Sequence, residues 1–421
     1  ASALPSGGNW NIVFAYFQGG WDILLSLDPR DPVVFSRDVL QDTRIDPGYD
    51  SLIVPSKPDP APLATSVPSM MLGPFMEPLV PFADRMSIVR GMSMETLTHE
   101  VGRRRFITGR PPSGLQARGS SIATVLAAQI GHGVPIPNLS ANVETYNVDQ
   151  PSYASALKVA TVSDLVRSLS PGAVTMDDLQ QERIDDLLEA FRECESTQRS
   201  IERLDALDLR AGAHSLVAQN LDERFDFLAP TPEMADLRAR YGITNNLATP
   251  EAQAAMAATA LVEGISRVVS FTATESLDTH YTDWQTLQGP RQERGFSAIA
   301  ALATDLASRP HPDGGSWLDK TIIVGFSEFC RTALLNANGG RDHSLTNACF
   351  LLGGGVVGGQ VIGASSDVGM SPTTTDLVTG LPSASGEILK PEHVMRALLE
   401  RVGLTDDVAD LRVPALSALL A

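Results

Sequence analysis

The chain has few cysteines, no surplus of basic charge and no long apolar run, and each shortage limits what it can be. Lysine and arginine number 32 against 50 aspartates and glutamates, a net charge of −18, so the chain has no basic surplus to neutralise nucleic-acid phosphates. No run approaches the roughly 18 to 20 apolar residues of a membrane helix. The glycines at 353–355, 358 and 359 are not followed by Lys-Ser/Thr, which excludes a phosphate-binding loop of that type.

Three cysteines in 421 residues leave two readings open. Cys330 and Cys349 flank one loop and could pair in an exported protein, which would leave Cys194 unpaired. All three serve equally well as buried free thiols. The opening Ala-Ser-Ala, followed by proline and glycine, resembles a trimmed terminus. We therefore expect export to the periplasm or the extracellular space with the signal peptide removed.

Apolar and charged contents of 43% and 19% describe an ordinary soluble globular protein. Predicted helices at 119–131, 250–265, 295–308 and 391–403 alternate with apolar strands. This order predicts an α/β fold with a doubly wound, mostly parallel sheet. Residues 174–228 are acidic and poor in glycine and proline, with apolar residues at helical spacing. They predict a hairpin of helices at 175–206 and 212–228. We expect one α/β domain over 1–421 with a helical insertion or cap at 174–250.

Three β-branched, apolar stretches predict strands that are covered on both faces: residues 11–17, 267–273 and 321–326. Polar side chains gather shortly after each stretch, and in open α/β sheets ligands bind beyond the carboxyl ends of the strands. These side chains are Asp22, Asp278, His280, Ser327, Glu328 and Arg331, with Asp342 and His343 in the next glycine-rich loop. Turn capping would explain any one of them, but three clusters together favour a metal site.

Carboxylates and imidazoles without thiolates suit one or two divalent ions, Zn, Mn or Fe before Ca or Mg. One ion could take Asp278, His280 and His343. A second could take Asp22, Glu328 and His99. Asp342 would either ligate directly or orient His343. Arg331 would bind a phosphate or sulfate oxygen or, equally well, form a structural ion pair.

The motifs GGWD (19–22), DTH (278–280), SEFCRT (327–332), GGRDH (339–343) and LLGGGVVGGQV (351–361) resemble a bacterial family of exported proteins. This family, a domain of unknown function numbered fifteen-oh-one, is alkaline-phosphatase-like and often described as sulfatase-like. THEVGRRRFITG (98–109) resembles a further family segment. The resemblance covers nearly the whole chain. It implies an alkaline-phosphatase-like fold with metal at the strand ends.

Carried over by position, Asp22, Asp278, His280, Glu328 and His343 match metal-binding positions of the alkaline phosphatase superfamily. His99, nine residues before Thr108, stands at the position of the nucleophile. Phe329 replaces a metal-binding histidine. Both departures count against covalent phosphatase or sulfatase chemistry, because imidazole is a poor substitute for a metal-activated alkoxide.

Thr98 is the neighbouring candidate nucleophile; otherwise a bound ion would lower the pKa of its water toward about 7. The predicted function is metal-dependent hydrolysis of a phosphate or sulfate ester outside the cytoplasm. The substrate would be a small anionic ester or a sulfated or phosphorylated glycan. The alternative is a catalytically silent metal-binding or structural protein of the same fold.

Overall fold

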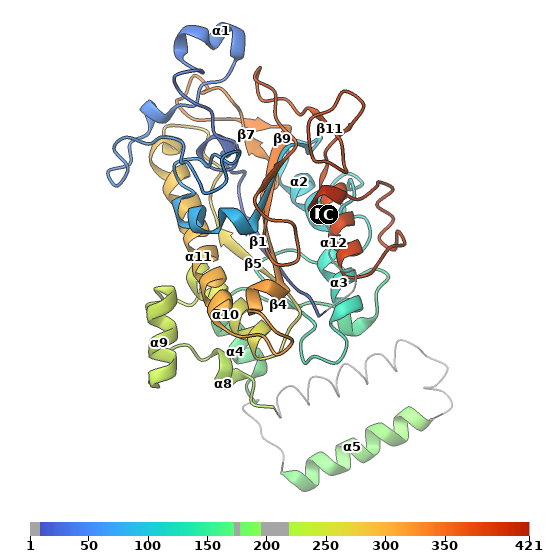
Figure 1. Cartoon of the computed structure of the whole chain (residues 1–421). Helices are drawn as coiled ribbons and strands as arrows, with labels where there is room; N and C mark the ends of the chain where they lie inside the picture. Colours follow the sequence, from blue (N-terminus) through green and yellow to red (C-terminus); the bar gives the residue numbers. More distant parts are fainter. Residues whose placement is uncertain (1–8, 172–176, 195–218, 421) are drawn as a thin grey trace.

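An eight-stranded sheet runs through the computed structural model, which describes residues 9–171, 177–194 and 219–420 (Figure 1). The strand order is β10-β2-β9-β6-β1-β5-β3-β4. The strands are β1 (Asn11–Phe17), β2 (Met86–Ser93), β3 (Asn138–Ala141), β4 (Leu157–Val159), β5 (Val268–Thr274), β6 (Thr321–Phe326), β9 (Thr346–Gly353) and β10 (Gln360–Ile362). Two-residue strands form two further ladders, β7 (Cys330–Arg331) with β8 (His343–Ser344) and β11 (Thr374–Thr375) with β12 (Glu387–Ile388).

The central strands are parallel, and β9 runs against them. In β1, Ile12 lies opposite Val268 of β5 and Ile322 of β6 in parallel register. β9 pairs antiparallel with both β6 and β2. The amino end of β9 therefore lies at the same edge of the sheet as the carboxyl ends of β1, β5 and β6. This reversal lets His343, just before β9, join residues that follow the other strands.

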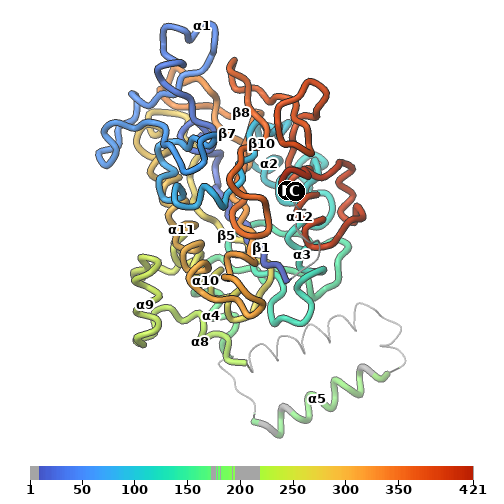
Figure 2. Tube along the Cα trace, viewed as in Figure 1, coloured from blue at the N-terminus to red at the C-terminus, as the bar shows by residue number. Residues whose placement is uncertain are grey.

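Alternate residues of β1 belong to two separate cores. Val13, Ala15 and Phe17 pack into the first core, under the layer of α10 and α11. Ile12 and its alternate neighbours pack into the second core, with α2, α3 and α12. Figures 1 and 2 show these helices on opposite faces of the sheet. Because both faces are covered, every residue of β1, β5 and β6 is buried, which explains their continuous apolar sequences.

The described helices include several with clear start and stop signals. For example, α4 begins with a capping box at Thr161 and Asp164, and α2 ends at Gly109 in the left-handed conformation. The helices are α1 (Leu40–Thr43), α2 (His99–Thr108), α3 (Ile122–Ile130), α4 (Val162–Leu169), α5 (Asp178–Glu193), α8 (Asp222–Phe225), α9 (Pro232–Tyr241), α10 (Pro250–Val262), α11 (Gly289–Ser308) and α12 (Pro391–Arg401). None in the described ranges has the length and hydropathy of a membrane span.

The predicted α/β class with a large, mostly parallel sheet between helices is confirmed. The strands at 11–17 and 321–326 have the predicted bounds, whereas β3, β4 and β10, with three or four residues each, were missed. Of the predicted helical hairpin, α5 covers part of the first helix. The second, at 212–228, lies partly outside the described residues. Its described part, from residue 219 on, holds the short α8, and Phe225 and Phe227 are buried in the first core.

Cys330 and Cys349 are buried free thiols. Cys330 lies in β7 and Cys349 in β9. Burial raises the pKa of both thiols, which makes them poor nucleophiles. The reading as buried free thiols is therefore confirmed for Cys330 and Cys349, but it is wrong for the burial of Cys194, which is exposed.

Candidate metal centre

Loops from distant parts of the chain meet at the carboxyl edge of the sheet through close backbone contacts. Gly19, after β1, has φ +112, and a Cβ there would lie 2.5 Å from the backbone nitrogen of Leu277. Only glycine lets the β1 loop approach the β5 loop so closely. Gly102 in α2 likewise leaves room for the carbonyl of Glu328, which a Cβ would approach to 2.3 Å. The first contact places Asp278 beside the β1 loop, and the second places His99 over the end of β6.

Each of the three imidazoles is held through its Nδ1 atom. Nδ1 of His99 lies 2.7 Å from Oε1 of Glu328. Nδ1 of His280 lies 3.1 Å from Oδ1 of Asp342. Nδ1 of His343 lies 2.6 Å from the carbonyl oxygen of Leu97. Because all three partners are acceptors, each Nδ1 carries a hydrogen. The Nε2 atoms are the ones left for other chemistry.

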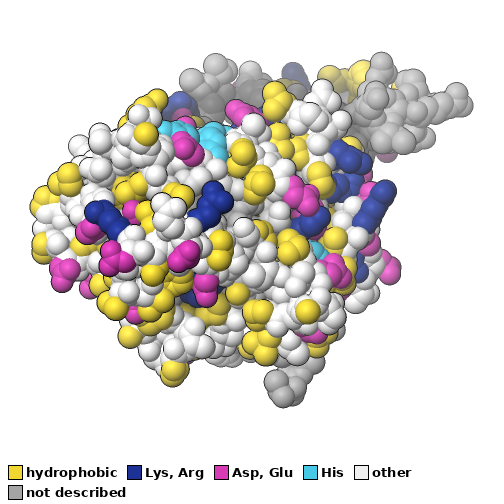
Figure 3. All heavy atoms as spheres, turned by 90° about the horizontal axis from the view of Figure 1, so that it is seen from above, with side chains coloured by type: hydrophobic (Ala, Val, Ile, Leu, Met, Phe, Trp, Pro, Cys, Tyr) yellow, Lys and Arg dark blue, Asp and Glu magenta, His cyan; other side chains and the backbone are white. Residues whose placement is uncertain are grey.

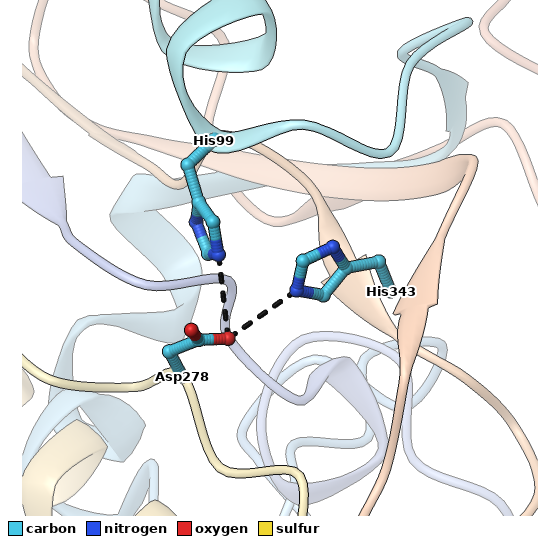
Figure 4. A group of neighbouring side chains, drawn as sticks. All are labelled: His99, Asp278 and His343. Carbon is cyan, nitrogen blue, oxygen red and sulfur yellow. Dashed lines mark hydrogen bonds and ion pairs between the residues drawn. The ribbon is translucent and has the colours of Figure 1, made fainter.

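The Nε2 atoms converge on one oxygen, Oδ1 of Asp278. The distances to this oxygen are 3.3 Å for His99, 2.9 Å for His280 and 3.3 Å for His343. Figure 4 shows His99 entering from α2, His343 from the start of β8 and Asp278 from the loop after β5. Ligand atoms of His99, Asp278 and His343 all lie within 4.8 Å of one another. Figure 3 shows histidine side chains at the surface beside an acidic side chain.

Glu328 is a partner of His99 inside the protein, with its side chain 1% exposed. Its Oε1 also accepts a 2.9 Å hydrogen bond from the Gly19 N–H, and Ser327 donates to its Oε2. Burial opposes ionisation of Glu328, but the hydrogen bond from His99 outweighs it and lowers the pKa of the carboxyl group. Glu328 and Asp342, predicted as ligands, thus lie behind His99 and His280 in the outer-shell arrangement typical of metal-binding histidines. Asp342 contacts His280 and not His343, the partner predicted for it.

The charge states of the remaining groups follow from burial and from their neighbours. Burial lowers the pKa of His343. Burial also disfavours the imidazolium of His99, but Glu328 outweighs it, and the pKa of His99 is raised. For Asp278, the hydrogen bond and charge of Arg331 overcome burial and hold the pKa well below its usual range. An ionised carboxylate therefore faces a neutral His343 whose Nε2 carries no hydrogen.

Arg331 is an ion-pair partner of Asp278, at 2.7 Å, and its side chain is 0% exposed. Its Nε and Nη2 groups donate to the carbonyl oxygens of Gly20 and Gly19. Its Nη1 group donates to the carbonyl oxygen of Arg341 and contacts Nε2 of His280 at 3.2 Å. These five acceptors match the five N–H groups of a guanidinium. Of the two roles predicted for Arg331, the structural ion pair is the one that these contacts describe.

Asp22 does not join the cluster. Its Oδ2 lies 2.9 Å from Nε of Arg341 and accepts a 2.8 Å hydrogen bond from Trp284 Nε1. Its Oδ1 caps the first turn after β1 through the Leu24 N–H. Both partners of this ion pair are fully buried. The structure therefore gives Asp22 a structural setting, outside the group formed by His99, Asp278 and His343.

Thr98, the predicted nucleophile, is the exposed residue that precedes α2. Its hydroxyl lies 3.2 Å from the hydroxyl of Thr96. None of the described groups within hydrogen-bonding distance of this hydroxyl is a base that would activate it. The contacts of Thr98 are those of a surface threonine.

The donor set fits a divalent ion on two observations. Nε2 of His99 is buried without a hydrogen-bond partner. His343 presents a bare Nε2 3.3 Å from an ionised carboxylate oxygen. Two ligands about 2.1 Å from one ion at tetrahedral angles are about 3.4 Å apart, close to these separations.

The sequence carries no signal for three backbone features of the site, because they depend on how the backbone packs. They are the carbonyl of Leu97 and the close contacts of Gly19 and Gly102.

The comparisons with known proteins identify a family. The model described as "Protein of unknown function (DUF1501)" matches residues 11–380. No curated protein matches the chain. A solved structure titled "Crystal structure of Ps i-CgsB in complex with k-i-k-neocarrahexaose" is 8% identical, with a TM-score of 0.42, over 97% of this chain and 75% of the other. The predicted membership is confirmed: the chain belongs to the DUF1501 family of proteins of unknown function.

Proposed function

We propose that this protein is a metal-dependent hydrolase of phosphate or sulfate esters. The single observation that carries the proposal is the convergence of His99, Asp278 and His343. Two imidazoles, each fixed through Nδ1, direct Nε2 toward one ionised carboxylate. Two histidines and one carboxylate are a ligand set of hydrolytic zinc sites and of non-haem iron sites. A single Zn, Mn or Fe ion is the occupant we propose.

The finer fold assignment belongs to this proposal. The order of motifs resembles the alkaline phosphatase superfamily, and the site lies at the carboxyl edge of a mostly parallel sheet, where that superfamily has its metals. Because the resembling proteins are exported, we place the reaction outside the cytoplasm. The substrate we propose is a small anionic ester or a sulfated or phosphorylated glycan.

The residues of the chain have separable tasks in this reaction. When bound, the ion would act as a Lewis acid toward the ester oxygen and lower the pKa of water toward about 7. Glu328 fixes the tautomer and ring orientation of His99, and Leu97 does the same for His343. Arg331 keeps Asp278 ionised. Thr98 lacks a base that would activate it, and His99 is directed at Asp278, so neither is suited to act as the nucleophile. The proposed reaction therefore uses no protein nucleophile.

A silent metal-binding protein is the second candidate, and one observation favours it. All five N–H groups of Arg331 are used inside the protein, so this guanidinium has no donor left for a substrate anion. The two functions share the metal site and differ in turnover. A screen of esters separates them.

The experiment begins with the metal content of the purified protein and of the His99→Ala/His343→Ala variant. The exposed His132, whose ring packs against Tyr153, supplies the matched control His132→Ala. We expect about one equivalent of metal in the wild type and in the control, and none in the double variant. Absence of metal after reconstitution with Zn, Mn and Fe would refute the hydrolase.

The metal-loaded protein is then assayed with 4-nitrophenyl phosphate and 4-nitrophenyl sulfate. Hydrolysis that survives Thr98→Ala and is lost in Asp278→Ala supports the proposed reaction. Loss of hydrolysis in Thr98→Ala would make Thr98 the nucleophile. A loaded protein without turnover on any ester would favour the silent metal-binding protein.

A further inference from the structure

A pocket of about 320 Å³ lies over β3 and β4, at the edge of the sheet beyond β5. Its lining includes Ser140 of β3, Lys158 of β4 and residues 142–146 of the loop after β3. Leu139 packs into the first core, so its neighbour Ser140, with Lys158 beside it in parallel register, points to the opposite face. The pocket therefore lies on the face of the sheet that α2 and α3 cover, and it has the size of a small-molecule site.

Two contacts connect this pocket to the candidate metal centre. Arg103 follows His99 by four residues in α2, which puts both side chains on one face of the helix. Its Nη2 group donates to Oε1 of Glu144 in the pocket lining at 2.7 Å. Nδ2 of Asn142, also in the lining, donates at 2.7 Å to Oε1 of Glu275, which begins the loop from β5 to the metal centre. The pocket and the metal centre therefore border the same stretch of α2 and the same loop.

The pocket and the arginines behind it carry positive charge, in a chain whose overall charge is −18. Oε1 of Glu144 accepts hydrogen bonds from Arg103 and Arg104. Its Oε2 accepts from Arg104 and Tyr146. Two arginines thus face one carboxylate. Lys158 adds a third positive charge: it is exposed, and its ammonium group makes no hydrogen bond or ion pair with any residue in the described ranges. This ammonium group is therefore available to bind an anion.

The distance from the pocket to the metal centre is too great for one small ester to contact both. Lys158 lies level with Ser140 of β3 and, through it, with Ser270 of β5. The end of β5 at Thr274 lies about 13 Å further along the strand, and two strand spacings of about 10 Å in total separate β4 from β5. An extended oligosaccharide can span this separation. Asn142 is exposed and its Oδ1 accepts no hydrogen bond from the described residues, so it can accept one from a sugar hydroxyl.

We propose that this pocket is a substrate subsite that binds a second anionic group, so that the substrate is a glycan chain carrying several sulfate or phosphate groups. One ester of the chain lies at the metal, and Lys158 binds another group further along. This inference rests on the proposed function and selects the glycan over the small ester among the substrates named there. A nucleic acid is the less suitable polyanion, because the protein as a whole has no basic surplus.

The test measures, by isothermal titration calorimetry, the binding of a short dextran sulfate to the full-length metal-loaded protein, to Lys158→Gln and to Lys320→Gln. Lys320 is the matched control, because it directly precedes β6, at the amino end of that strand, and lies over the Trp10 ring. We expect equal affinity in the wild type and Lys320→Gln. Lys158→Gln should bind about tenfold more weakly, the effect of one hydrogen bond to a charged group. Metal content should be equal in all three proteins, and unsulfated dextran should not bind.

Equal affinity of the wild type and Lys158→Gln for dextran sulfate, or no binding by the wild type, would overturn the inference. Binding of unsulfated dextran with the same affinity would also overturn it. So would binding of a short duplex DNA with the same loss in Lys158→Gln, since the pocket would then accept any polyanion. In each of these cases the metal content of the wild type and its hydrolysis of 4-nitrophenyl sulfate still decide the proposed function. No bound metal in the wild type would instead remove the hydrolase, whatever the pocket binds.

Discussion

The Asp22→Asn variant tests whether Asp22 has a structural role or is a metal ligand. The carboxylate faces two donors on Oδ2, from Arg341 and Trp284, and one on Oδ1, from Leu24. An asparagine amide must turn its NH₂ group toward one of these sides, where it meets a donor. It also leaves the guanidinium of Arg341 buried beside a neutral group. Arg341 is fully buried and lies over the Trp284 ring at 4.8 Å.

Breaking a buried ion pair by changing one partner costs about 3–5 kcal/mol. The total stability of a folded domain is about 5–15 kcal/mol, so the loss in Asp22→Asn is a large part of the whole. We expect a clearly lower midpoint of guanidinium-induced unfolding, followed by circular dichroism. The matched control is Asp50→Asn. Asp50 pairs with Arg37 at 3.0 Å with both side chains more than half exposed, so its loss should leave the midpoint unchanged.

The same Asp22→Asn protein, at a temperature where it remains folded, should bind as much metal as the wild type. A variant with the wild-type midpoint and no metal would refute the reasoning and return Asp22 to the ligand set. A wild-type midpoint with normal metal content would show that the ion pair contributes nothing.

Three further predictions concern His99 and its supports. Glu328→Gln keeps a hydrogen-bond acceptor for His99 but removes the charge. Chelator competition should show metal affinity lower by about tenfold, at the low end for outer-shell partners; unchanged affinity would contradict the role of Glu328. Protons compete with metal for His99, whose pKa is raised by Glu328, so metal affinity should fall as the pH drops through that pKa. In Glu328→Gln the fall should begin at a lower pH. Metal affinity that does not change with pH would exclude His99 as a ligand. Gly102→Ala places a Cβ 2.3 Å from the Glu328 carbonyl, so α2 must shift and metal affinity should fall. A metal affinity equal to that of the wild type would show that α2 need not be so close to Glu328.

The sequence predicted the buried strands well because burial on both faces leaves a direct mark on composition. β1 and β6 are continuous apolar runs, and polar residues follow them at once. The short strands β3, β4 and β10 carry no such mark, since three or four residues cannot establish a pattern. The sequence also could not predict that β9 runs antiparallel to its neighbours, because an apolar run does not show which strands it pairs with or in which direction.

The candidate site was predicted as a set of residues, but the sequence could not assign the role of each one. The sequence grouped Asp278 and His343 with His280 around one ion and placed His99 with a second ion, whereas the structure brings His99, Asp278 and His343 together. Glu328 and Asp22 are both carboxylates that follow buried strands, yet one supports His99 and the other pairs with Arg341. The difference depends on which donor each carboxylate meets, and those donors come from elsewhere in the chain.

The His99–Glu328 hydrogen bond joins residues 229 positions apart, and the contact of His343 with Asp278 spans 65. During synthesis, the ribosome makes His99 long before either Asp278 or His343 exists. The nascent chain therefore lacks a complete ligand set until β5, β6 and the start of β8 have all been synthesised. An ion held by His99, Asp278 and His343 therefore cannot initiate folding of the chain. It can only stabilise a sheet whose strands have already paired.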